Sequence, residues 1–144
     1  MELSKLISNL PETVPSIVLK KYFIDVIRDL KNDSIIEKER VSELLQILSY
    51  KQWHNYNIFE IDLRFKIDIF VIYLLAGDIS NNLVENVGET IGYLGLTKSY
   101  ERLKEISNER NTEFEIRSTI NEIFKEFGDR VDNPYSGFWG NHFE

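Results

Sequence analysis

Apolar side chains recur every three or four residues along most of this chain, which is the spacing of an amphipathic helix. In the first part of the chain, the pattern predicts a short helix that ends before Pro11 and a second helix over residues 16–31, with Pro15 at its first turn. A third helix is predicted over residues 36–51. Its buried face would consist of Val41, Leu44, Leu45 and Leu48.

Residues 52–60 form the least regular segment, which is rich in aromatic and amide side chains. A short strand over residues 56–62 would suit the aromatic and β-branched content. No second strand is visible to pair with it, and an isolated strand is not stable. A helical restart is therefore expected here, within a connection between the two halves of the chain.

Glycine and serine mark the helix boundaries of the second half. A long, mostly buried helix is predicted over residues 62–76, and Gly77 is expected to end it in the left-handed conformation that glycine adopts readily. Ser80 is expected to cap the next helix, which continues to Leu94 and stops at Gly95.

Two further helices are predicted before the end of the chain. One begins at Thr97 or Ser99, either of which can cap it. The other begins with the capping box formed by Thr112 and Glu115 and ends at Gly128. The chain is therefore expected to be a single all-α domain, residues 1–144, of about seven helices.

The helices that end at Gly95 and Gly128 match each other at an offset of 33 residues. The matched pairs are Leu83 and Ile116, Val87 and Ile120, Ile91 and Phe124, Leu94 and Phe127, and the two glycines. Each of these helices follows another helix. Residues 61–128 are therefore expected to form antiparallel helix pairs, stacked as a short α-solenoid or a helical bundle.

Residues 83–95, Leu-Val-Glu-Asn-Val-Gly-Glu-Thr-Ile-Gly-Tyr-Leu-Gly, resemble the second helix of a HEAT-type repeat in their small residues and closing Leu-Gly. The resemblance spans residues 61–128, and its second copy departs from the pattern at Phe124 and Phe127. It implies a HEAT-like scaffold that binds macromolecules along the surface of the second helices. Residues 1–60 match this pattern weakly or not at all.

The side chains opposite the apolar stripe of the two matching helices are the candidate partner-binding residues. They are Glu85, Asn86, Glu89 and Tyr93 on the first helix, and Ser118, Thr119, Glu122 and Glu126 on the second, with Glu115 one turn earlier. Together they would form an acidic groove, which suits a basic partner. The alternative is that these are ordinary solvated helix positions.

The charge balance supports the choice of a basic partner. The chain holds 17 basic and 24 acidic residues, for a net charge of −7, and residues 61–144 account for nine of the basic and fifteen of the acidic ones. An acidic surface repels nucleic-acid backbones and steers basic proteins toward it. Acidity that only keeps the protein soluble is the alternative.

The compartment follows from what the sequence lacks. There is no cysteine, which excludes disulfides and thiolate chemistry and is natural in a reducing compartment. The N-terminus has none of the features of a secretion signal, and the apolar stretch 67–76 is too short to cross a membrane. A cytoplasmic location without membrane contact is expected.

Signatures of catalysis are also missing. The two histidines, His54 and His142, form no HExxH pair, and the sequence has no phosphate-binding glycine loop and no Gly-x-Ser-x-Gly elbow. No cofactor, metal site or enzymatic activity is expected. A helical enzyme is the third hypothesis, and it would require a buried carboxylate or histidine in a pocket.

The C-terminal tail, residues 129–144, differs in composition from the helices because it is rich in glycine and aromatic residues. Its aromatics are expected either to cover the last helix pair or to anchor an interface. The candidate anchors are Tyr135, Phe138 and Trp139.

In its size, its acidity and its Ile-, Asn- and Lys-rich composition, the chain resembles a small bacterial toxin-immunity protein. The resemblance implies that the protein binds a cognate toxin, expected to be a basic nuclease, and occludes its active site. The alternative is a HEAT-like adaptor or regulatory scaffold that binds a basic protein or peptide.

Overall fold

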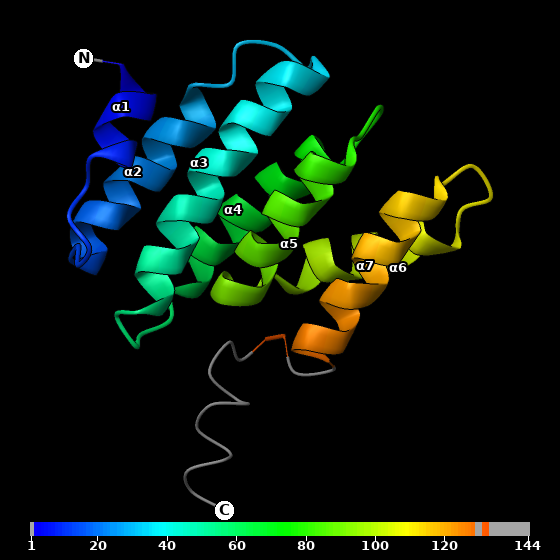
Figure 1. Ribbon diagram of the computed structural model, residues 1–144. Helices are drawn as coiled ribbons and strands as arrows, with labels where there is room; N and C mark the ends of the chain where they lie inside the picture. The colour runs from blue at the N-terminus through cyan, green and yellow to red at the C-terminus, as the bar shows by residue number, and fades with distance from the viewer. Residues whose placement is uncertain (1, 129–130, 133–144) are drawn as a thin grey trace, which may run out of the picture.

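The computed structural model describes residues 2–128 and 131–132, and it forms seven helices and no strand within them (Figure 1). The predicted all-α class and the number of helices are confirmed. The helices are α1 (Leu3–Ser8), α2 (Ser16–Arg28), α3 (Ile35–Trp53), α4 (Ile61–Leu74), α5 (Asn81–Leu94), α6 (Thr97–Asn108) and α7 (Phe114–Phe127).

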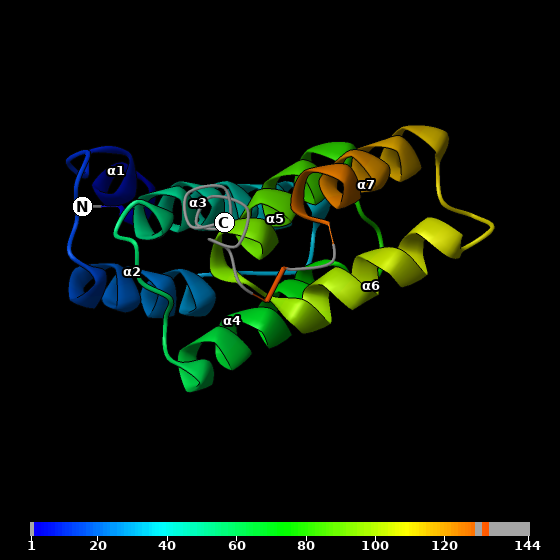
Figure 2. The ribbon, with the colours of Figure 1, turned by 90° about the horizontal axis from the view of Figure 1, so that it is seen from below.

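The helices lie in two layers. Figure 2 shows α2, α4 and α6 in one layer and α3, α5 and α7 in the other, with α1 beside α3. Within each layer every helix contacts the next, and each helix of the first layer also contacts its successor along the chain. The chain is therefore built from three successive helix pairs, of which the first involves residues outside the predicted range 61–128.

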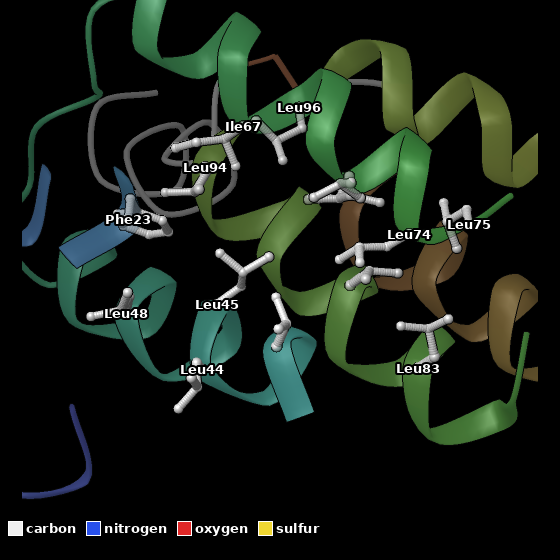
Figure 3. Packing of buried hydrophobic residues seen from close by; sticks show 14 of the residues in the cluster. Phe23, Leu44, Leu45, Leu48, Ile67, Leu74, Leu75, Leu83, Leu94 and Leu96 are labelled. Atoms are coloured by element: carbon white, nitrogen blue, oxygen red, sulfur yellow. The ribbon is translucent and has the colours of Figure 1, made fainter. Parts of the chain in front are cut away.

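The core fills the space between the two layers. Figure 3 shows Phe23 from α2, Leu45 and Leu48 from α3, and Ile67 and Leu74 from α4, all fully buried. Burying one such side chain contributes roughly 1.5–3 kcal/mol of hydrophobic free energy. The apolar face predicted for residues 36–51 is confirmed, since all four of its members are buried.

The connection between the two halves is a loop, so the predicted helical restart is wrong. Helix α3 continues to Trp53, and the chain then turns at Tyr56, which has a φ of 55°. Side-chain amides hold the loop in place: Gln52 donates to the carbonyl of Asn57 (3.1 Å), and Asn55 donates to the carbonyl of Val14 (2.8 Å). These side-chain hydrogen bonds satisfy backbone carbonyls that helical hydrogen bonds would otherwise satisfy.

Three of the predicted boundaries are confirmed. The Ser80 hydroxyl accepts a hydrogen bond from the backbone N–H of Leu83 at the start of α5 (3.2 Å). Gly77 follows α4 with a φ of 71°, and Gly95 ends α5 in the left-handed conformation with a φ of 75°. Glycine suits both positions because it has no Cβ to clash there.

The predicted caps of α6 and α7 are wrong. The buried carboxylate of Asp68 on α4 caps α6 instead, accepting from the backbone N–H groups of Lys98 (3.0 Å) and Ser99 (2.7 Å). No capping box forms at α7, because the Thr112 hydroxyl donates to the carbonyl of Ile106 in the preceding helix. A residue from another helix can satisfy the same free N–H groups as a local cap.

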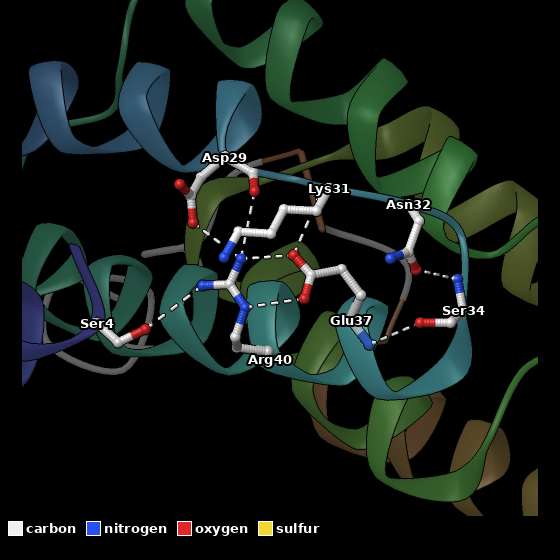
Figure 4. A network of polar contacts seen from close by, with 7 residues as sticks. All are labelled: Ser4, Asp29, Lys31, Asn32, Ser34, Glu37 and Arg40. Carbon is white, nitrogen blue, oxygen red and sulfur yellow. Dashed lines mark hydrogen bonds and ion pairs between the residues drawn. The ribbon is translucent and has the colours of Figure 1, made fainter. Parts of the chain in front are cut away.

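A polar network joins the first three helices (Figure 4). The Arg40 guanidinium on α3 contacts Glu37 (2.6 Å), the carboxylate of Asp29 after α2 (2.8 Å), and the hydroxyl of Ser4 on α1 (3.4 Å). The hydrogen bond from Arg40 lowers the pKa of Glu37 to about 2, aided by a backbone N–H from Lys31. The same contacts raise the pKa of Arg40 above its already high value.

Helix α4 is less buried than predicted. One side packs on the core, but Ile61, Phe65, Ile69 and Tyr73 are between 46% and 73% exposed. The reason lies in the sequence, because apolar and charged residues alternate from 61 to 69, so a helix there carries apolar residues on both sides.

Within the described residues, no helix combines the length and the apolar composition that crossing a bilayer requires.

Candidate functional site

The candidate site lies on the layer formed by α3, α5 and α7, whose helices run in the same direction. Ser42 on α3 contacts Asn86 on α5, and farther along Tyr50 contacts Tyr93. Likewise, Gly88 and Gly92 of α5 lie against Ile123 and Phe127 of α7 in the same order. The C-terminal ends of the three helices therefore lie on the same side of the molecule, where their partial negative charges add. A cation is favoured near these ends.

The predicted carboxylates lie on this layer and remain accessible. Glu85, Glu115, Glu122 and Glu126 are exposed, and Glu89 is half-buried. Of these five, Glu122 alone forms an ion pair with a described residue, Lys125 on its own helix (3.6 Å). The other four are not neutralised by a described cation, although Glu85 accepts a hydrogen bond from the Asn81 amide (3.3 Å).

Three predicted polar residues hold the layer together or lie partly buried within it. Asn86 donates to the hydroxyl of Ser42 on α3 (3.1 Å), and Thr119 on α7 donates to the side-chain oxygen of Asn81 on α5 (2.6 Å). Ser118 is half-buried. Asn86 and Thr119 therefore bridge neighbouring helices, and their contact with a partner stays a prediction.

The structure adds residues from α3 that the prediction omitted. A groove of about 450 Å³ runs between α3 and α5 and is lined by Ile36, Glu39, Arg40, Glu43, Gln46, Asn82 and Asn86. Glu43 is exposed and makes no ion pair with any described residue. The sequence did carry a signal for this row: Glu39, Glu43, Gln46 and Tyr50 follow a helical spacing on the side of α3 away from its apolar stripe.

An aromatic cluster lies at the C-terminal ends of these helices. The ring of Tyr93 lies 5.6 Å from those of Tyr50 and Trp53 and 6.4 Å from that of Phe127. Burial, together with the negative charges of Glu89 and Glu126, raises the pKa of the Tyr93 hydroxyl. The hydroxyl is therefore influenced by a carboxylate from each of two helices.

Comparison with known proteins gives no match. No family model, curated protein or solved structure is significantly similar to this chain. The HEAT-like and immunity-protein resemblances therefore stay predictions.

The predicted anchors Tyr135, Phe138 and Trp139 lie outside the described residues, as does His142.

The described part of the site suits recognition by charge and aromatic contact. No three histidine, aspartate or glutamate side chains among the described residues come together as a metal site. The ring nitrogen Nδ1 of His54 lies 2.8 Å from the carbonyl of Tyr50, one turn earlier in the same helix. Carboxylates next to aromatic rings favour the side chains of lysine and arginine.

Proposed function

We propose that this protein is a protein-binding module whose α3/α5/α7 face binds a basic protein. One observation supports this above the others: five glutamates on that face make no ion pair with any described residue. They are Glu43, Glu85, Glu89, Glu115 and Glu126. Carboxylates that are not neutralised within the protein steer a basic partner and contribute specificity when it docks.

The aromatic cluster supplies the non-electrostatic part of the proposed contact. Tyr50 is 47% exposed and its ring lies 5.6 Å from that of Tyr93, whose hydroxyl is within the influence of the Glu89 and Glu126 charges. A lysine or arginine of the partner would place its charge between the two carboxylates and its apolar stem on the Tyr50 ring. Tyrosines in such positions concentrate binding energy because they bury a large area at low entropic cost.

We further propose that the module acts as a cytoplasmic bacterial immunity protein. Its acidic face would occupy the basic cleft of a nuclease toxin, where the phosphate backbone of the substrate would otherwise bind. The small size, the net charge of −7 and the all-helical fold support this form of the proposal. Inhibition would follow from occlusion of the cleft and would require no chemistry from this chain.

A HEAT-like adaptor is the second candidate. Three successive helix pairs place their second helices, α3, α5 and α7, on one face, which is the surface that the HEAT resemblance implies for binding. An adaptor would use the same carboxylates for a peptide or protein that it binds and releases. The two candidates therefore differ in what binding does to the partner.

The first test is affinity capture from the native cell with tagged protein at about 0.05 M and about 0.3 M salt. We expect wild type to retain one basic protein in stoichiometric amount, and Glu89→Lys combined with Glu126→Lys to lose it. The matched control is Glu101→Lys combined with Glu105→Lys, which makes the same charge change on α6 in the opposite layer. Equal recovery by both double variants would refute the acidic face.

A second measurement separates the two candidates. The captured protein is expressed in a host with and without the wild-type module. Restored growth, lost with the Glu89→Lys and Glu126→Lys variant, is expected of an immunity protein. A captured protein that is harmless by itself would contradict the immunity form and favour the adaptor.

A further inference from the structure

The layer opposite the acidic face exposes an apolar stripe along α4. Ile61 is 73% exposed, Phe65 51%, Ile69 46% and Tyr73 51%, and the four follow one another at intervals of four residues. The alternate set, Leu63, Ile67, Val71 and Leu74, is buried in the core. Contiguous exposed apolar surface of this kind marks a contact site more often than a solvated one.

Three cations, Arg64, Lys66 and Lys98, and two carboxylates, Asp62 and Asp132, lie on or beside the stripe, so its local charge is positive in a protein that is acidic as a whole. Lys98 on α6 lies over the Phe65 ring, with its nitrogen 4.5 Å from the ring centroid. The buried Nε of Arg64 has no hydrogen-bond partner, and no described residue forms an ion pair with Arg64, Lys66 or Lys98. A buried donor without a partner is destabilising, and an oxygen acceptor that reached it would relieve this cost.

A cavity connects these charges to the stripe. It has a volume of about 290 Å³ and lies between α4 and the start of α6, lined by Ile61, Arg64, Phe65, Asp68, Gly95, Thr97, Lys98 and Asp132. The Asp68 carboxylate is already used by the N–H groups of Lys98 and Ser99. The cavity therefore offers an incoming group apolar walls, the two cations Arg64 and Lys98, and one remaining carboxylate, Asp132.

We infer that the α4 stripe is a second docking surface, and that its occupant is an amphipathic helix of a partner protein with carboxylates beside its apolar face. Apolar residues of that helix would cover Phe65 and Ile69, and a carboxylate would reach Arg64 and Lys98. Charge complementarity selects this occupant, because carboxylates would pair with Arg64, Lys66 and Lys98, which form no ion pair with any described residue. The chain would then join two different partners.

The test uses fluorescently labelled model helices of about 18 residues that share one leucine face and differ only in flanking Glu or Lys. Binding to the whole protein is followed by anisotropy at about 0.05 M and about 0.3 M salt. We expect the Glu-flanked helix to bind roughly tenfold or more tightly than the Lys-flanked one at low salt, and the preference to shrink at high salt.

Two double variants separate the apolar contribution to peptide binding from the electrostatic one. Phe65→Ser with Ile69→Ser is expected to weaken both helices by about tenfold or more, and its exposed positions let circular dichroism confirm an intact fold. Arg64→Gln with Lys98→Gln is expected to remove the preference for Glu. The matched control, Lys5→Gln with Lys125→Gln, makes the same charge change in the opposite layer and is expected to keep that preference.

Three outcomes would overturn the inference: no binding of the Glu-flanked helix, equal binding of the two helices, or binding that survives the serine substitutions. Analytical sedimentation tests the remaining alternative, which is that the stripe forms a dimer contact. A dimer that the serine variant abolishes, without any peptide binding, would assign the stripe to a second copy of this chain. Because these variants lie on α4 and α6, their failure would leave the proposal for the α3/α5/α7 face intact.

Discussion

At the scale of single residues, Asp68 connects two helices that are distant in sequence. Its buried carboxylate caps α6 from α4 and also accepts from the Ser99 hydroxyl. We predict that Asp68→Asn lowers the free energy of unfolding by about 1–3 kcal/mol, because the new amide NH₂ would face N–H donors. Urea denaturation measures the change. Asp25→Asn, on α2, is the control and is expected to change stability by less than about 0.5 kcal/mol.

Glu37 makes stability depend on pH in the acidic range. Its side chain is 12% exposed, and the Arg40 contact lowers its pKa to about 2, so the folded state binds its proton more weakly than the unfolded chain does. The stabilisation is complete above the unfolded pKa of about 4.3 and is lost as the pH falls toward 2. We predict that Glu37→Gln costs roughly 2–3 kcal/mol at pH 7 and little near pH 2, measured by urea denaturation across that range. A cost independent of pH would contradict this assignment.

At the scale of elements, two glycines of α5 determine how closely α7 packs. A Cβ on Gly92 would lie 2.0 Å from the ring of Phe127, and one on Gly88 would lie 2.3 Å from the end of Ile123. We predict that Gly92→Ala destabilises wild type by roughly 1–2 kcal/mol, because the ring must move. In a Phe127→Ala background the same change should stabilise by up to about 1 kcal/mol, the helix propensity of alanine over glycine.

A double-mutant cycle on Gly92 and Phe127 measures this change of sign. The same sign in both backgrounds would mean that the packing of α7 does not depend on the close approach of Phe127 to Gly92.

The Gly92 and Phe127 pair also explains why the second copy of the sequence match departs from the first. Where α5 has a small residue, α7 supplies a large one to fill the space, so the two helices are complementary and not equivalent.

Sequence periodicity was sufficient to predict the helices but not their tertiary contacts. The stripe of Val41, Leu44, Leu45 and Leu48 could be predicted because helical spacing places them on one face. The Asp68 cap could not, because its acceptor is 30 residues from its donors. For α4, the alternation of apolar and charged residues over 61–69 shows that a helix there has apolar residues on two sides, but it does not show which side packs on the core.

At the scale of the whole molecule, the two layers carry different surfaces. The predicted carboxylates of α5 and α7 do share one layer, as the sequence indicated, because equivalent helices of successive pairs lie side by side. Helical spacing places Glu43 and Tyr50 on one side of α3, but it does not show that α3 packs beside α5 in this layer, which depends on tertiary contacts. Electrostatic steering of the proposed basic partner would be a property of the whole layer, since no single side chain could supply it.

Glutamates held on one face without internal ion pairs should cost stability, because like charges repel and Glu126 lies in the last turn of α7, near the negative end of its dipole. We predict that Glu89→Gln with Glu126→Gln stabilises the fold by a few tenths to about 1 kcal/mol at low salt, and by less at about 0.5 M salt. Urea denaturation at both salt concentrations checks this. Glu101→Gln with Glu105→Gln, which removes ion pairs to Lys104 and Arg102, should not stabilise. A face that keeps glutamates at a cost in folding stability is consistent with selection for partner binding. If the Glu89 and Glu126 double variant were instead less stable than wild type, these carboxylates would contribute to folding stability.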